Sequence, residues 1–180
     1  AGNADGFIKL SAFLFAGKGG VFYLKILKPQ YRFLNVMQIT PEDIKKSGAR
    51  AVLVDADNTL AFHGSQQPYP GAVDWLRSLA AAGIPAVIIS NNNRERIKPF
   101  AEKLGLPFVE KSAKPLPKGF LKACKRLGVS PRETAVIGDQ IFTDVLGGNI
   151  IGAKVFLTEP LGPETDKFIK LKRHFEKWVK

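Results

Sequence analysis

The sequence of 180 residues has a single cysteine, and its first part almost lacks acidic side chains. One cysteine, Cys124, excludes an intramolecular disulfide and a zinc site built from several cysteines. We expect Cys124 to pack on the apolar face of a helix. In residues 1–34 no apolar run reaches the roughly 18 to 20 residues that a membrane-spanning helix needs. This segment could lie on a membrane surface but should not cross it.

Residues 1–34 form a basic and aromatic segment, which we treat as an N-terminal arm. Between Gly6 and Pro41 no acidic residue occurs, while basic and aromatic side chains alternate. Three interpretations stay open: a helix packed on the core, a partner-binding arm, or residual targeting or added sequence. Acid-poor amphipathic leaders are typical of organelle import, although arginine and serine are too scarce here to favour it.

Residues 163–180 are predicted to form a basic amphipathic C-terminal helix. Its apolar stripe consists of Phe168, Leu171, Phe175, Trp178 and Val179. A stripe of this kind commonly packs on its own domain. Beside basic residues it also suits an anionic membrane surface, and together with the N-terminal arm it predicts reversible, salt-dependent binding.

The charge balance points to an anionic partner. The chain has 27 lysine and arginine residues against 16 aspartate and glutamate residues, a formal net charge of +11. Nucleic acid, a membrane surface or a phosphorylated substrate would each suit that charge. With 45% hydrophobic residues, the length predicts one globular domain, which we place at residues 35–162.

The stretch from Ala51 to Leu60 is the centre of the predicted domain. Four apolar residues run directly into Asp55 and Asp57. A short β-branched run predicts a strand covered on both faces, with the two carboxylates at its carboxyl end. Two anions forced together repel unless a cation lies between them, and Mg²⁺ with oxygen ligands meets that need. An ordinary turn rich in aspartate and asparagine is the alternative interpretation.

The rest of the domain alternates helices with strands. Apolar periodicity and capping residues predict helices over residues 41–46, 71–82, 97–104 and 120–127. Short apolar runs predict further strands over residues 86–89, 107–109, 135–137 and 153–157. This order predicts parallel βαβ units, and therefore an α/β fold with a mainly parallel sheet between helical layers.

Polar residues follow each of four predicted strands. They are Asp55 with Asp57, Ser90 with Asn91, Lys114, and Asp139 with Asp144. Each alone is typical of a turn, a helix cap or a solvated side chain. Together, at the edge of a parallel sheet where ligands bind, they supply a nucleophile, acids, metal carboxylates and a fixed cation. That set suits phosphoryl transfer.

These motifs resemble those of the haloacid dehalogenase superfamily. The strings Ser90-Asn-Asn-Asn-Arg, Ala113-Lys-Pro and Gly138-Asp-Gln, with the later Thr-Asp-Val-Leu-Gly-Gly-Asn149, are similar to the YqeG-type phosphatases of class IIIA, relatives of phosphatidylglycerophosphate phosphatases. The resemblance covers about residues 33–160. It implies a Rossmann-like three-layer α/β/α sandwich. Relatives usually carry an arginine where Ile150 stands, so an altered specificity is expected if that arginine holds substrate.

The resemblance also implies roles for the site residues. Asp55 would be the nucleophile, and Asp57 would protonate the leaving group and then activate water. Asp55, the backbone carbonyl of Asp57 and Asp139 would hold Mg²⁺. The remaining candidates are Ser90, Asn91 and Lys114 for the substrate phosphate, with Asp144 and Thr59 orienting the metal ligands from outside.

Spacing further predicts that the core carries no large cap domain. Only 32 residues lie between Asp57 and Ser90, and 23 between Ser90 and Lys114, each enough for one helix and a loop. An uncovered site suits a large or membrane-bound phosphomonoester better than a small enclosed metabolite.

Three functions follow as hypotheses. The first is a Mg²⁺-dependent phosphatase that converts phosphatidylglycerophosphate to phosphatidylglycerol. We would expect it in the cytoplasm, peripherally bound to the inner face of the membrane, with organelle import left open. The second is a phosphatase on nucleic-acid termini or phosphoproteins. The third is a nucleic-acid-binding protein with a vestigial phosphatase site, against which the intact set of acids argues.

Overall fold

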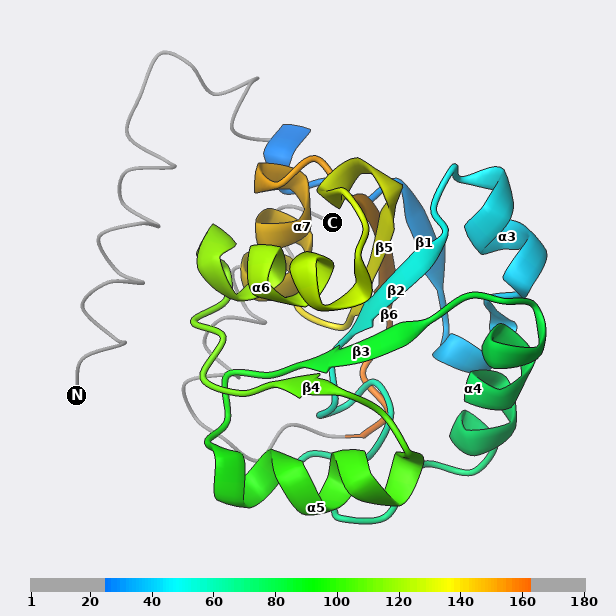
Figure 1. Ribbon diagram of the computed structural model, residues 1–180, viewed down its shortest axis with the longest axis vertical. Helices are drawn as coiled ribbons and strands as arrows, with labels where there is room; N and C mark the ends of the chain where they lie inside the picture. The colour runs from blue at the N-terminus through cyan, green and yellow to red at the C-terminus, as the bar shows by residue number, and fades with distance from the viewer. Residues whose placement is uncertain (1–24, 163–180) are drawn as a thin grey trace.

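The computed structural model describes residues 25–162, which form one parallel six-stranded sheet between helices (Figure 1). The strand order is β1-β6-β5-β2-β3-β4. The strands are β1 (Tyr31–Phe33), β2 (Ala51–Val54), β3 (Ala86–Ile89), β4 (Phe108–Val109), β5 (Thr134–Gly138) and β6 (Lys154–Thr158). All neighbouring strands pair in parallel, so all six carboxyl ends lie at one edge of the sheet.

Helices cover both faces of this sheet. The α-helices are α3 (Pro41–Lys46), α4 (Ala72–Ala81), α5 (Arg94–Leu104), α6 (Pro117–Leu127) and α7 (Leu146–Ile150). Short 3-10 turns cover Val36–Gln38 and Pro131–Glu133, and a π-helix covers Ile141–Val145. This arrangement confirms the three-layer α/β/α fold, and no cap domain is evident among residues 25–162.

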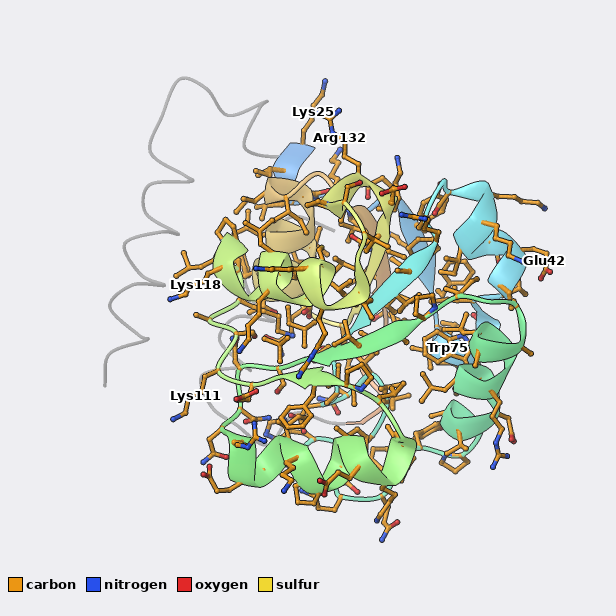
Figure 2. All side chains as sticks on the ribbon, in the orientation of Figure 1. Lys25, Glu42, Trp75, Lys111, Lys118 and Arg132 are labelled. Carbon is orange, nitrogen blue, oxygen red and sulfur yellow. The ribbon has the colours of Figure 1, made fainter. Side chains whose placement is uncertain are left out.

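Side chains of β2 alternate between two apolar cores, as the pleat requires. Val52 and Val54 pack in the core that includes α3, α4 and α5, whereas Leu53 packs against α6 on the other face. Trp75 of α4 lies in the first core and donates from its indole Nε1 to the carbonyl oxygen of Ile39 at 2.8 Å (Figure 2). Strand β2, which ends directly before Asp55, is therefore buried on both faces, which confirms the prediction.

Local sequence explains several helix boundaries. In α3, Thr40 and Asp43 form a reciprocal capping box with Pro41 at the first turn, as predicted. Helix α5 begins at an Asn93 cap, and its C-cap Gly105 adopts a left-handed conformation with φ of 65°.

The structure differs from the sequence predictions in several elements. Strand β1 was not expected, and it extends the sheet to Tyr31, inside the segment assigned to the N-terminal arm. The π-helix and α7 were also not predicted. In α6 the buried face holds Phe120, Ala123 and Cys124, so Cys124 packs as predicted, while Leu121 is exposed.

The side chain of Asn149, in α7, forms hydrogen bonds with residues 26–30 at the start of the described part of the chain. Its side-chain Nδ2 donates to the carbonyl oxygens of Ile26 and Lys28 at 2.7 and 3.0 Å, and its Oδ1 accepts from Gln30 at 2.9 Å. Ile150 follows directly, and Lys154 then opens β6. Ile150 thus lies toward the amino edge of the sheet, away from Asp55, which argues against the expectation that this position contacts substrate.

Residues 1–24 and 163–180 lie outside the described residues, and with them most of the predicted arm and the whole predicted C-terminal helix. Among the helices between residues 25 and 162, none has the length and apolar content of a membrane-spanning segment.

Candidate active site

The residues predicted from four strand ends come together at the carboxyl edge of the sheet. Asp55 follows β2, Ser90 follows β3, Lys114 lies beyond β4 and Asp139 follows β5. Asp55, Lys114 and Asp139 are all buried. Because charged side chains are rarely buried without partners, this grouping is unusual for a purely structural region.

Lys114 joins two of the buried carboxylates. Its Nζ donates to Asp55 Oδ1 at 2.6 Å and to Asp144 Oδ1 at 2.7 Å. Burial raises the pKa of Asp55 to about 7, because desolvation penalises its carboxylate, and the nearby ammonium opposes that rise. Burial alone would lower the pKa of Lys114, but Asp144 and Asp55 outweigh it and shift the pKa upward. Lys114 is therefore a fixed cation.

Three carboxylates converge beside this cation. One oxygen from each of Asp55, Asp139 and Asp144 lies within 4.8 Å of the others. Three negative charges next to one ammonium leave a net charge of −2 when all are ionised, in a region with little water to screen it. A divalent cation with oxygen ligands would neutralise that charge, so the donor set fits such an ion. Asp144 belongs to this cluster, whereas we predicted that it would act from outside.

The close approach of Asp144 depends on Gly138. A Cβ atom at position 138 would overlap the carboxyl group of Asp144, so only glycine fits there. The π-helix then holds Asp144 over the end of β5, with the backbone N–H of Gln140 donating to Asp144 Oδ2 at 3.2 Å. The glycine of the Gly138-Asp139 motif therefore does more than allow a turn, because it leaves room for the carboxyl group of Asp144 beside Asp139.

Asn91 holds the loop that carries Lys114. Its Oδ1 accepts from the Lys114 backbone N–H at 2.7 Å and from Ser112 Oγ at 2.9 Å, and its Nδ2 donates to the Lys114 carbonyl at 3.1 Å. The side chain of Asn91 thus positions Lys114, a task that the sequence analysis did not assign to it. Ser90 is buried beside it, and its Oγ accepts from the Asn92 backbone N–H at 3.1 Å.

Asp57 occupies a different environment from Asp55. Its carboxylate accepts from Asn92 Nδ2 at 2.6 Å, from Arg96 Nη2 at 3.0 Å and from the Gly64 backbone N–H at 2.9 Å. It contributes no carboxylate oxygen to the three-acid cluster found among residues 25–162. The two acids that are one residue apart in sequence therefore have separate partners, as two different chemical tasks would require.

Thr59 and two residues that the sequence analysis did not predict complete the surroundings. Thr59 is buried, and its Oγ1 makes no hydrogen bond within the described part of the chain. Asn92 and Arg96 were missed. The Ser-Asn-Asn-Asn string was a signal for Asn92, but nothing in the local sequence distinguishes Arg96 from Arg94.

Comparison with known proteins agrees with this geometry. A family model described as haloacid dehalogenase-like hydrolase matches residues 15–152. This chain belongs to that family. Over 155 residues the sequence of this hydrolase is 35% identical to that of the "Probable phosphatase YqeG" of Bacillus subtilis (strain 168). The match covers 86% of this chain and 90% of that protein. These findings identify it as a phosphatase.

Two further comparisons are more distant. The hydrolase is 27% identical over 151 residues to "Phosphatidylglycerophosphate phosphatase 1, chloroplastic/mitochondrial" of Arabidopsis thaliana, which covers 78% of this chain and 43% of that protein. A crystal structure of a hydrolase of this family from Deinococcus radiodurans R1, with bound phosphate and sodium, superposes with a TM-score of 0.51 at 22% identity. That superposition covers 71% of this chain and 88% of the other and supports the fold alone.

Removal of the buried ammonium of this hydrolase is expected to destabilise it. Lys114→Met leaves Asp55 and Asp144 without their cation, and loss of one partner from a buried ion pair costs about 3–5 kcal/mol. The folded-state pKa of Asp55, about 7, lies above its ordinary value of 3.8, so the folded state binds more protons than the unfolded state between these values. Stability therefore falls as pH rises through this window.

Without Lys114 the pKa of Asp55 should rise further, so the loss in Lys114→Met should be larger at pH 8 than at pH 5. Urea unfolding in the presence of a chelator measures both values. Lys111→Met is the matched control, because Lys111 lies in the same loop and is exposed. Equal stability of Lys114→Met and wild type at pH 8 would contradict the role of Lys114 as counter-ion.

Proposed function

We propose that this phosphatase is Mg²⁺-dependent, works through an aspartyl phosphate and removes the terminal phosphate of phosphatidylglycerophosphate at a membrane surface. The observation that carries the chemistry is the buried pair of Asp55 and Lys114 beside Asp139 and Asp144. A carboxylate held next to an ammonium in a desolvated site is a suitable nucleophile for a phosphomonoester.

In the first step, an oxygen of Asp55 attacks phosphorus, and the bond from phosphorus to the substrate oxygen breaks. Asp57 donates a proton to the departing alkoxide. In the second step Asp57 takes a proton from water, whose oxygen attacks the aspartyl phosphate, so that Asp55 and inorganic phosphate are released. Such acid–base assistance contributes typically about 10²- to 10⁴-fold.

The other residues bind and orient. Lys114 places positive charge next to the transferring phosphoryl group and favours the ionised form of Asp55. Ser90 and the neighbouring backbone amides, ahead of the α5 N-terminus, would hold phosphate oxygens. Mg²⁺ would be held by Asp55, Asp139 and Asp144, together with the backbone carbonyl of Asp57. When bound, it supplies charge neutralisation between the nucleophile and the phosphate.

The lipid substrate is supported by an apolar rim at the carboxyl edge of the sheet. We define this rim by three exposed side chains on loops that leave three different strands: Leu34 after β1 (63% exposed), Phe62 after β2 (48%) and Leu116 after β4 (60%). β1 and β4 are the outermost strands, so the rim crosses the whole sheet. Large apolar side chains exposed along the sheet edge that carries the site suit contact with the apolar part of a membrane surface.

Basic residues next to the rim suit an anionic surface. Lys111 and Lys118 flank Leu116, and Figure 2 shows both side chains pointing outward on the same side of the molecule. In the first half of α6, which begins at this edge of the sheet, Lys118 and Lys122 are exposed, and the helix contains no acid. Near an anionic bilayer each such charge contributes about 1 kcal/mol at low salt. The sequence-based prediction that both termini bind the same surface stays a prediction.

The expected result is faster hydrolysis of phosphatidylglycerophosphate in vesicles than of a 5′-phosphorylated oligonucleotide. Leu116→Glu should lower vesicle co-sedimentation and turnover of the lipid by about tenfold, since it replaces inserted apolar area with a charge. Hydrolysis of a small soluble phosphomonoester should not change. A substrate panel and co-sedimentation at low and high salt measure these effects.

Ile150→Glu provides the matched control, because Ile150 is an exposed apolar residue (44%) at the opposite edge of the sheet. Equal loss with both variants, or equal binding to neutral and anionic vesicles, would argue against the lipid surface. Preference for the phosphorylated oligonucleotide would assign the site to nucleic-acid termini instead.

A further inference from the structure

The carboxylate of Asp57 is clamped by three donors from two segments of the chain. Oδ1 accepts from the Gly64 backbone N–H at 2.9 Å and from Arg96 Nη2 at 3.0 Å. Oδ2 accepts from Asn92 Nδ2 at 2.6 Å. Gly64 belongs to the loop after β2, while Asn92 and Arg96 lie just before and within the first turn of α5. The orientation of this acid therefore depends on how α5 and that loop sit together.

These three hydrogen bonds determine which oxygen of Asp57 can carry a proton. A carboxylate offers about four acceptor positions, two on each oxygen. On Asp57 both positions of Oδ1 are used, and one position of Oδ2 is used. The fourth position, on Oδ2, is where a proton can be held and passed on without breaking any of these three bonds.

Arg96 connects the acid to the loop above it. The same Nη2 that contacts Asp57 also donates to the Ser65 carbonyl at 3.0 Å, and Nη1 is buried without a hydrogen-bond partner in the described residues. The backbone carbonyl of Arg96 accepts from Gln66 Nε2 at 2.8 Å. The backbone N–H of Arg96 donates to Oδ1 of Asn93, the N-cap residue of α5, at 3.0 Å. Lys103, later in α5, donates to the Gln66 carbonyl at 2.9 Å.

We propose that Arg96 is a positioning residue for general acid catalysis: it holds Asp57 so that Oδ2 presents the proton to the leaving oxygen. This inference rests on the proposed function, in which Asp57 is the acid. Arg96 contacts neither Asp55 nor Lys114 in any of its hydrogen bonds, so it acts on protonation of the leaving group and not on the nucleophile.

The distinguishing test is the dependence of the rate on the leaving group. p-Nitrophenyl phosphate releases a stabilised phenolate that needs little protonation, whereas glycerol 3-phosphate releases an alkoxide that does. Arg96→Gln should lower kcat/KM for glycerol 3-phosphate by about 10²-fold and for p-nitrophenyl phosphate by less than about fivefold, because general acid assistance is worth roughly 10²- to 10⁴-fold. Asp57→Asn should give the same pattern with a larger difference.

Arg96→Lys should recover part of the lost rate. Both side-chain contacts of Arg96 come from one nitrogen, and a lysine ammonium can also donate two hydrogen bonds. Arg94→Gln is the matched control, since Arg94 lies in the same turn of α5 but is 58% exposed and pairs with Glu110. It should leave both rates unchanged. Circular dichroism and the melting temperature show whether each variant is folded.

The outcomes separate this inference from the proposed function. Suppose that the wild type hydrolyses both substrates and that Asp57→Asn loses more rate on glycerol 3-phosphate than on p-nitrophenyl phosphate. If Arg96→Gln then loses the same factor on both substrates, the positioning role alone is overturned. The same holds if Arg96→Lys folds but recovers nothing. Absence of wild-type turnover with Mg²⁺ on both substrates would overturn the proposed function and this inference together.

Discussion

Replacement of Asp55 by asparagine is expected to lower phosphomonoester hydrolysis by about 10⁵-fold or more. Enzymes of this kind provide at least about 10⁶-fold acceleration, and loss of the nucleophile removes most of it. Asparagine keeps the size of the side chain but cannot attack phosphorus. Because Asp55 is a buried charge, its removal relieves desolvation, although it also takes one partner from Lys114. Asp144 remains as the partner of Lys114, so we expect the variant to fold.

Two measurements test this expectation. Steady-state rates on a soluble phosphomonoester give the loss, and acid quenching with radiolabelled substrate should trap a phosphoenzyme in the wild type and none in Asp55→Asn. Asp74→Asn is the control, because Asp74 is an exposed carboxylate on α4 that pairs with Arg77. A near wild-type rate in Asp55→Asn would remove the assignment of the nucleophile.

Removal of divalent metal should reduce activity by about 10³-fold, and added Mg²⁺ should restore it. The physical reason is the cluster of Asp55, Asp139 and Asp144, which would repel a phosphate dianion unless a cation neutralises it. Full activity in a chelator would contradict this expectation. Asp139→Ala should raise the Mg²⁺ concentration needed for half-maximal rate.

Metal binding should also be visible without turnover. A ligand that binds only the folded state stabilises it by about 2.7 kcal/mol at one hundred times its dissociation constant. Mg²⁺ should therefore raise the melting temperature of the wild type, and raise it less in Asp139→Ala. A melting temperature that does not respond to Mg²⁺ in either protein would mean that the cluster holds no such ion. Asp74→Asn again serves as the control, with the same response as the wild type.

Much of the fold was predictable because its signals are local. Strand β2 is an uninterrupted apolar run, and α3 carries a capping box whose two residues are three positions apart. Strand β1 was not predicted, because the alternation of Tyr31, Arg32 and Phe33 extends over only three residues, too few to indicate a strand by itself. It joins the sheet through its pairing with β6, more than a hundred residues later, and Tyr31 and Phe33 stack on Phe156.

The candidate site divides in the same way. Asp55, Ser90, Lys114 and Asp139 follow predicted strands, and parallel strands bring their carboxyl ends to one edge, so their convergence could be inferred from order alone. The contact of Asp57 with Arg96 could not be inferred from that order. Arg96 is 39 positions away in sequence, and its selection over Arg94 depends on which side of α5 faces the loop after β2.

The sequence by itself determined which chemical groups stand at the carboxyl edge, because apolar runs that end in polar residues specify strands and their ends. The tertiary structure decided which of those groups meet. Asp144 joins Asp55 and Asp139 because Gly138 has no Cβ to exclude it, and Asp57 turns to Arg96 and Asn92 instead. Separations of this kind depend on helix rotation and close packing between distant segments, which spacing along the chain does not encode.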